Sequence, residues 1–141
     1  MKNILILCTG NSCRSILAQA YINHKSEEWI AYSAGSQPTG KVHPLALETL
    51  ESAGIDAGYA RSKSWDEFTG PNAPIMDIIV TVCNDAAGES CPVWPGHPTT
   101  YHWPFPDPAK FSGSDEDARA YFREVFNMIK NRIDDFLTSE R

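Results

Sequence analysis

The sequence has 141 residues, of which 42% are hydrophobic and 21% charged, with a formal net charge of -6. This is the balance of an ordinary globular protein, and its acidity disfavours a nucleic-acid backbone as the main partner, because phosphate-backbone binding needs a basic surface. The apolar runs are far shorter than the roughly 20 residues of a membrane-spanning helix, so we expect no membrane segment. The N-terminus lacks the pattern of a secretory signal. We therefore expect a cytoplasmic protein whose four cysteines are reduced at rest.

Hydrophobic periodicity and turn residues predict alternating strands and helices. In chain order we expect a strand over 2–7, a helix opening at Ser15, a strand over 29–34, a helix from Pro44 to Gly54, a short helix over 64–68, strands over 77–82 and 99–103, and a long C-terminal helix capped by Ser114. Such alternation indicates a single α/β domain over residues 1–141, with a parallel sheet and right-handed crossovers.

Three reactive side chains follow predicted strands closely: Cys8, Cys83 and Asp107. In open α/β sheets ligands bind at the carboxyl ends of the strands. We therefore expect these three side chains to converge at one end of the sheet.

The segment from Cys8 to Arg14 joins a strand to a helix and has the spacing Cys-x5-Arg. Successive backbone N–H groups in a tight loop can surround a tetrahedral oxyanion, and Arg14 can hold two of its oxygens. Gly10 and Asn11 tolerate the positive φ that such a loop tends to require. The predicted oxyanion-binding residues are Thr9, Gly10, Asn11, Ser12, Cys13, Arg14 and Ser15.

The same positive field predicts a thiolate at Cys8, with its pKa lowered from about 8.5 towards neutrality, and Ser15 can donate a hydrogen bond to the sulfur. Cys8 is therefore the candidate nucleophile. The loop lacks the Gly-x4-Gly-Lys pattern of a nucleotide-binding P-loop. The four cysteines lack the short Cys-x2-Cys spacing of zinc ribbons, so we expect no metal site and no bound cofactor.

Cys8-Thr-Gly-Asn-Ser-Cys-Arg-Ser15 resembles the signature loop of the low-molecular-weight tyrosine phosphatase superfamily, and more narrowly that of its thioredoxin-coupled arsenate reductases. The resemblance extends along the chain through Tyr32-Ser-Ala-Gly35, Val80-Thr-Val-Cys83, Cys91-Pro92 and His102-Trp103 leading to Asp107-Pro-Ala109. It implies a four-stranded parallel sheet of strand order 2-1-3-4 with helices on both faces. It also implies arsenate as substrate, with phosphate or sulfate as mimics, and thioredoxin as reductant.

Hydrolysis of a phosphate ester needs Cys8, Arg14 and an acid, whereas Cys83 and Cys91 suggest a reductive relay. If the sheet order is that of the family, the strands ending at Cys8 and Cys83 are neighbours, about 4.8 Å apart, which is within reach of a disulfide. Our hypothesis is that Cys83 attacks Cys8 and that Cys91 then attacks Cys83, leaving a disulfide for an external dithiol protein. Alternatively, Cys83 is an inert core residue and Cys91 an incidental loop thiol.

Asp107 lies between two prolines, and we expect it to be a partly desolvated general acid, although Asp is also common in turns without chemistry. Ala109 and Lys110 follow it, where tyrosine phosphatases of the family carry aromatic residues, and this favours a small inorganic substrate. The resemblance suggests that Asn11 and Ser33 support the loop. Some relatives bind potassium through an acidic residue of the first helix, but the matching position holds Gln19.

Two other functions remain open. A phosphatase acting on phosphotyrosine or a small phosphate ester would use the same loop. A thiol module without catalysis, such as a redox sensor or a phosphocarrier, would not need Arg14, whose presence favours transition-state stabilisation.

Overall fold

The computed structural model describes residues 2–82 and 98–139, so Cys83, Cys91 and the residues between them lie outside it. Its four strands form one parallel sheet in the order β2-β1-β3-β4. The strands are β1 Lys2–Cys8, β2 Trp29–Gly35, β3 Ile78–Thr81 and β4 Thr99–His102. The predicted strands and the order 2-1-3-4 are confirmed, with β3 shorter than expected by one residue at each end.

β1 forms the centre of the core because it is covered on both faces. Ile4, Leu5, Ile6 and Leu7 are all fully buried, the continuous apolar pattern typical of a parallel strand. Alternate side chains point to opposite faces, so Ile4 and Ile6 belong to one hydrophobic cluster and Leu5 and Leu7 to another.

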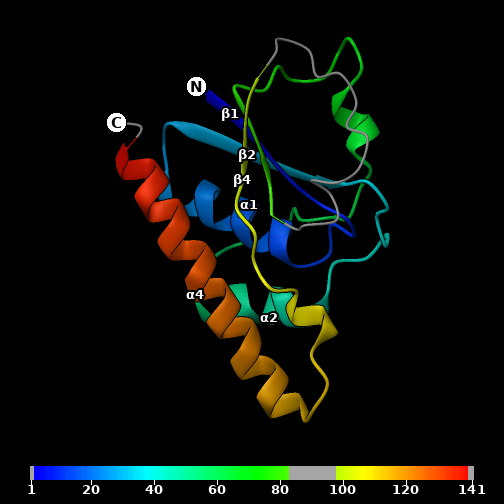
Figure 1. The fold of residues 1–141 in the computed structure, drawn as a ribbon, viewed down its shortest axis with the longest axis vertical. Helices are drawn as coiled ribbons and strands as arrows, with labels where there is room; N and C mark the ends of the chain where they lie inside the picture. The colour runs from blue at the N-terminus through cyan, green and yellow to red at the C-terminus, as the bar shows by residue number, and fades with distance from the viewer. Residues whose placement is uncertain (1, 83–97, 140–141) are drawn as a thin grey trace.

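The larger cluster lies between the sheet and three α-helices, α1 Arg14–Lys25, α2 Pro44–Ser52 and α4 Asp115–Ser139. α4 runs as a long rod beside α1 and α2 (Figure 1). Its buried side chains recur at helical spacing, from Phe122 to Phe136, and Ser114 caps it by accepting a hydrogen bond from Asp117 N at 3.1 Å. The helix that was predicted to open at Ser15 begins one residue earlier.

The smaller cluster is covered by the 3-10 helix η1 Trp65–Phe68, drawn in green away from the α-helices in Figure 1. Phe68 packs there with Leu5, Leu7 and Ile79. Helical segments therefore cover both faces of the sheet, as the family resemblance implied. No helix of the described residues has both the length and the apolar character to cross a membrane.

The topology brings the ends of β1 and β3 together. Leu7 pairs with Thr81, and Val82 N donates to Leu7 O at 2.9 Å. The expectation that these strands are neighbours is confirmed up to Val82, the residue before Cys83. A second 3-10 helix, η2 Pro108–Lys110, follows β4 on the same side, directly after Asp107.

Candidate active site

The segment 8–14, called the oxyanion loop below, turns from the end of β1 into the start of α1. Cys8 is 3% exposed, and its sulfur accepts a hydrogen bond from Asn11 N at 3.2 Å. Asn11 has a φ of 47° and is fully buried, so the predicted left-handed residue is confirmed at this position. Gly10, which could also tolerate a positive φ, is not among the described residues that adopt one. Gly10 packs closely against Thr39, since a Cβ at position 10 would lie 3.3 Å from Thr39 Cγ2.

A series of hydrogen bonds leads from Lys63 through Asn11 and Ser15 to the Cys8 sulfur, and each group in it can donate to the next. Lys63 N donates to Asn11 Oδ1 at 2.9 Å, and Asn11 Nδ2 donates to Ser15 Oγ at 2.7 Å. Ser15 Oγ lies 3.0 Å from Cys8 Sγ. A hydroxyl has one proton, and because Ser15 already accepts from Asn11 that proton is free to point at the sulfur. The chain of donors therefore favours a thiolate at Cys8.

The carbonyl groups of the oxyanion loop are tied to the segment that follows β2. Thr9 O accepts from Gln37 N at 2.9 Å, Gly10 O from Thr39 N at 3.0 Å, and Ser12 O from His43 N at 2.9 Å. In a planar trans peptide the C=O and the following N–H point in opposite directions. The next N–H groups along the loop therefore point inward, which is the concave donor surface that an anion requires.

Gly35 at the end of β2 allows the loop to lie this close to the sheet. A Cβ at position 35 would lie 2.4 Å from Thr9 O and 2.9 Å from Cys8 O. Any side chain would push the backbone carbonyls of the nucleophile and its neighbour away. This close contact explains sterically why the motif Tyr32-Ser-Ala-Gly35 ends in glycine.

Arg14 is held by two groups that follow β4. Its Nη1 donates to Phe105 O at 3.1 Å, and its Nη2 lies 3.5 Å from Asp107 Oδ2. The side chain is 12% exposed. Its Nε is buried and has no hydrogen-bond partner among the described residues. A buried guanidinium donor left without a partner is costly, and an oxyanion oxygen would satisfy it.

Asp107 lies beside the loop, as predicted for an acid. Its Oδ1 accepts from Ala109 N at 3.0 Å, which fixes the carboxylate at the start of η2, and its side chain is 20% exposed. Cys13 Sγ donates to the same oxygen at 3.5 Å. Burial, then the nearby charges of Asp107 and Cys8, raise the pKa of Cys13 to about 12, so this thiol keeps its proton. No local pattern in the chain predicts that Cys13 donates a hydrogen bond to Asp107.

Ser33 supports the loop only indirectly. Its hydroxyl, fully buried in β2, donates to Gln19 Oε1 at 2.5 Å. The ammonium of Lys63 lies 3.5 Å from Ser33 Oγ, while the Lys63 backbone reaches Asn11. Lys63 and Ser62, whose hydroxyl donates to Gly10 O at 3.1 Å, were missed by the sequence reasoning. A polar pair before a predicted short helix is too common a signal to single out.

The residues around Ser33 do not fit a potassium ion, the cation that the family resemblance brought into question at Gln19. Potassium requires several oxygen ligands, but Gln19 Oε1 is used by Ser33, and Gln19 Nε2 donates to Ala31 O at 3.2 Å. The Lys63 ammonium lies against the Ser33 hydroxyl and would repel a second cation. Within residues 2–82 and 98–139, no group of three or more His, Cys, Asp or Glu side chains could hold a metal ion.

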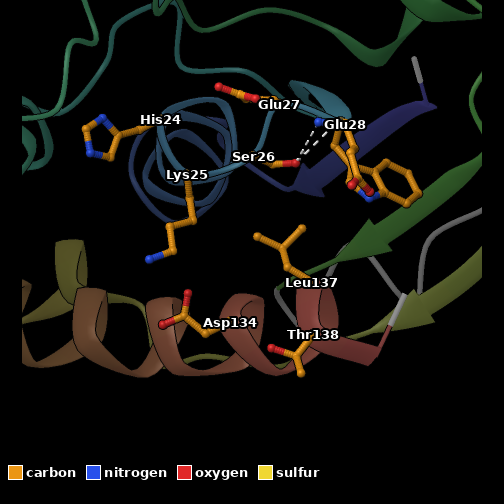
Figure 2. A pocket seen from close by; sticks show the side chains of 9 residues that line it. His24, Lys25, Ser26, Glu27, Glu28, Asp134, Leu137 and Thr138 are labelled. Carbon is orange, nitrogen blue, oxygen red and sulfur yellow. Dashed lines mark hydrogen bonds between the residues drawn. The ribbon is translucent and has the colours of Figure 1, made fainter. Parts of the chain in front are cut away.

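A separate cavity of about 620 Å³ lies at the other end of the molecule. It opens between the C-terminal end of α1 and the end of α4, with Trp29 at the start of β2 on its wall. Lys25 of α1 extends across it towards Asp134 of α4 (Figure 2). The oxyanion loop is at the opposite end of α1, so this cavity is not part of the candidate site.

Comparison with known proteins agrees with this geometry. The family model described as low molecular weight phosphotyrosine protein phosphatase matches residues 3–140. A protein named arsenate reductase from Bacillus licheniformis is 41% identical over 136 residues, covering 96% of this chain and 94% of that protein. One of the same name from Bacillus subtilis is 40% identical over the same coverage.

Solved structures show the same fold. The crystal structure of arsenate reductase from Archaeoglobus fulgidus has a TM-score of 0.75 at 27% identity, covering 96% of this chain and 98% of that one. An arsenate reductase in the phosphate binding state has a TM-score of 0.78 at 25% identity, covering 99% and 98%. With its Cys-x5-Arg loop between β1 and α1, this chain belongs to the low molecular weight phosphotyrosine protein phosphatase family.

Proposed function

We propose that this protein is an arsenate reductase in which Cys8 is the nucleophile. The observation that carries the proposal is the buried Arg14 Nε, which has no partner among the described residues and lies in a guanidinium already fixed by Phe105 and Asp107. A tetrahedral oxyanion bound to this donor and to the inward N–H groups would lie over the Cys8 sulfur. The name shared by relatives about 40% identical over nearly the whole chain supports arsenate as that oxyanion.

The first step is attack by the Cys8 thiolate on the arsenic atom of arsenate. An S–As bond forms and an As–O bond breaks, and Asp107 supplies the proton with which the oxygen leaves as water. Arg14 and the loop amides stabilise the charge on the remaining oxygens. Arsenic is still pentavalent after this step.

Reduction follows when Cys83 attacks the Cys8 sulfur. The new S–S bond forms as the S–As bond breaks, its electron pair stays on arsenic, and arsenite leaves. Cys91 then attacks Cys83 and releases the Cys8 thiolate, and an external dithiol protein reduces the Cys83–Cys91 disulfide. The pairing of β1 with β3 up to Val82 supports this relay, because it brings the chain to within one residue of Cys83 beside the end of β1. We propose thioredoxin as this dithiol protein on the basis of the family resemblance.

The test is arsenite production from arsenate with reduced thioredoxin, thioredoxin reductase and NADPH, run beside hydrolysis of a small phosphate ester. We expect arsenate-dependent NADPH oxidation that disappears in Cys8→Ser, Cys83→Ser and Cys91→Ser. Ester hydrolysis serves as the matched control, since it should be lost in Cys8→Ser but kept in the other two variants. Ester hydrolysis without any arsenate turnover would make the protein a phosphatase and refute the proposal.

A further inference from the structure

Lys63 is a buried lysine that the proposed chemistry does not use. It is 9% exposed, whereas the other lysines of the described residues are exposed or half-buried. Its Nζ donates to Arg61 O at 2.8 Å and lies 3.5 Å from Ser33 Oγ, and no carboxylate of the described residues forms an ion pair with it. Burial of an ammonium without a carboxylate partner is costly, which suggests that the charge has a role.

Lys63 belongs to a segment, residues 61–64, that lies behind the oxyanion loop and is called the backing segment below. Ser62 Oγ donates to Gly10 O, and Lys63 N donates to Asn11 Oδ1. On the other side Lys63 O accepts from Gly35 N at 2.9 Å, next to the bridge between Gly35 and Ser64. The backing segment therefore contacts the loop and β2 at once.

The ammonium of Lys63 contacts two oxygen atoms from separate parts of the chain. Arg61 O comes from the backing segment and Ser33 Oγ from β2, and Gln19 Oε1 of α1 accepts from that same Ser33 hydroxyl. The charged groups that act on Lys63 are Arg61, which disfavours its charge, and Glu67, which favours it. Burial, then Arg61, lowers the Lys63 pKa to about 8, so the side chain is still mainly a cation at neutral pH.

We propose that the Lys63 ammonium is the built-in cation of this oxyanion loop, joining β2 to the backing segment in place of a bound metal ion. Lys63 is a positioning residue, because it acts on the reacting atoms through Asn11 and Ser15. This inference rests on the oxyanion-binding part of the proposed function and does not depend on arsenate reduction.

The consequence for Cys8 follows from the direction of the hydrogen bonds. The Lys63 N–H is the first donor of the chain that passes through Asn11 and Ser15 to the Cys8 sulfur. Loss of the ammonium would remove one of the links between the backing segment and β2, leaving the Gly35 N to Lys63 O hydrogen bond, and would hold Asn11 less firmly. The Cys8 thiolate would then be less stabilised, and the loop less ordered for an anion.

The test uses the full chain with Lys63→Met, which removes the charge but keeps the length of the side chain, and Lys25→Met as an exposed control. The pH midpoint of Cys8 alkylation, followed by peptide mapping, reports the thiolate, and calorimetry with inorganic phosphate reports the loop. We expect Lys63→Met to raise the midpoint by about one pH unit and to weaken phosphate binding about tenfold. Lys25→Met should match the wild type in both. Wild-type values in Lys63→Met would overturn the proposal.

Lys63→Asp provides a rescue experiment, because it replaces the ammonium with an oxygen ligand beside Ser33 Oγ and Arg61 O. We expect it to regain phosphate affinity in potassium chloride but not in sodium chloride at equal ionic strength, while the wild type shows no potassium-specific gain. No rescue would assign the loss to side-chain packing and contradict the proposal, as would a potassium-specific gain in the wild type. If the Lys63 variants do not fold, Ser33→Ala removes the β2 partner and should shift the alkylation midpoint in the same direction; an unchanged midpoint there would overturn the proposal.

These measurements also separate this inference from the proposed function. Phosphate binding and Cys8 alkylation need no arsenate turnover, so a wild type that fails to reduce arsenate but shows the Lys63 effects would refute only the proposed function. Normal arsenate turnover in a Lys63→Met variant with unchanged phosphate affinity and midpoint would refute only the role of Lys63.

Discussion

Gly35→Ala tests whether the close approach of β2 to the oxyanion loop matters. The added Cβ would lie 2.4 Å from Thr9 O and 2.9 Å from Cys8 O, whereas ordinary contacts begin near 3.4 Å. Both atoms are backbone, so no flexible side chain can move aside, and the Thr9 carbonyl would have to retreat by about 1 Å. Overpacking of this kind costs about 2 kcal/mol of stability.

The larger effect is expected on the chemistry. A displacement of about 1 Å in a catalytic loop can reduce the rate about a hundredfold. We therefore expect Gly35→Ala to slow Cys8 alkylation at neutral pH and to weaken phosphate binding, measured together with the urea unfolding midpoint. Gly70→Ala is the matched control, because a Cβ there meets nothing within 4 Å and its φ is not positive. Equal behaviour of the two variants in unfolding and alkylation would refute the steric argument.

Three further predictions concern the parts of the fold around the loop. Arg14→Lys keeps a positive charge but loses the fork that contacts Phe105 and Asp107, and we expect phosphate affinity measured by calorimetry to fall at least about tenfold; an unchanged affinity would contradict the assigned role of the guanidinium. Ser114→Ala removes the cap of α4 and should cost about 1 kcal/mol in urea unfolding, whereas the exposed Ser112→Ala should cost nothing measurable. His43 caps α2 through Nδ1, which accepts from Leu45 N, and burial, opposed by Asp107, lowers its pKa below 6.5. Because folding disfavours protonation of His43, the stability contributed by this cap is complete above about pH 6.5 and is lost as the pH falls from there through the folded-state pKa of His43. His43→Asn provides a cap that does not titrate, so it should flatten that part of the plot of unfolding free energy against pH. An unaltered plot would contradict the assignment.

Local patterns in the chain determined the outline of the fold. The apolar run of β1 predicts a strand buried on both faces whatever surrounds it, and Ser114 followed by a periodic apolar stripe predicts α4 and its cap. The roles of Cys8 and Arg14 can likewise be predicted from the sequence, because the spacing of the oxyanion loop and its place between a strand and a helix are properties of one short segment. The position of Asp107 near the loop follows from the rule that parallel strands end at the same edge of a sheet.

Contacts between distant parts of the chain decided the rest. Lys63 lies 52 residues from Asn11, and Asp107 lies 94 residues from Cys13, so no local spacing signals either hydrogen bond. Gly10 and Asn11 could each tolerate the positive φ, and of these two it is Asn11 that adopts it, because the backbone angles of the loop depend on which carbonyls are tied to the segment after β2. The side chain that replaces a metal cation, and the glycine that lets the sheet touch the nucleophile's carbonyl, become visible only when packing brings these segments together, since each role is defined by its neighbours in space.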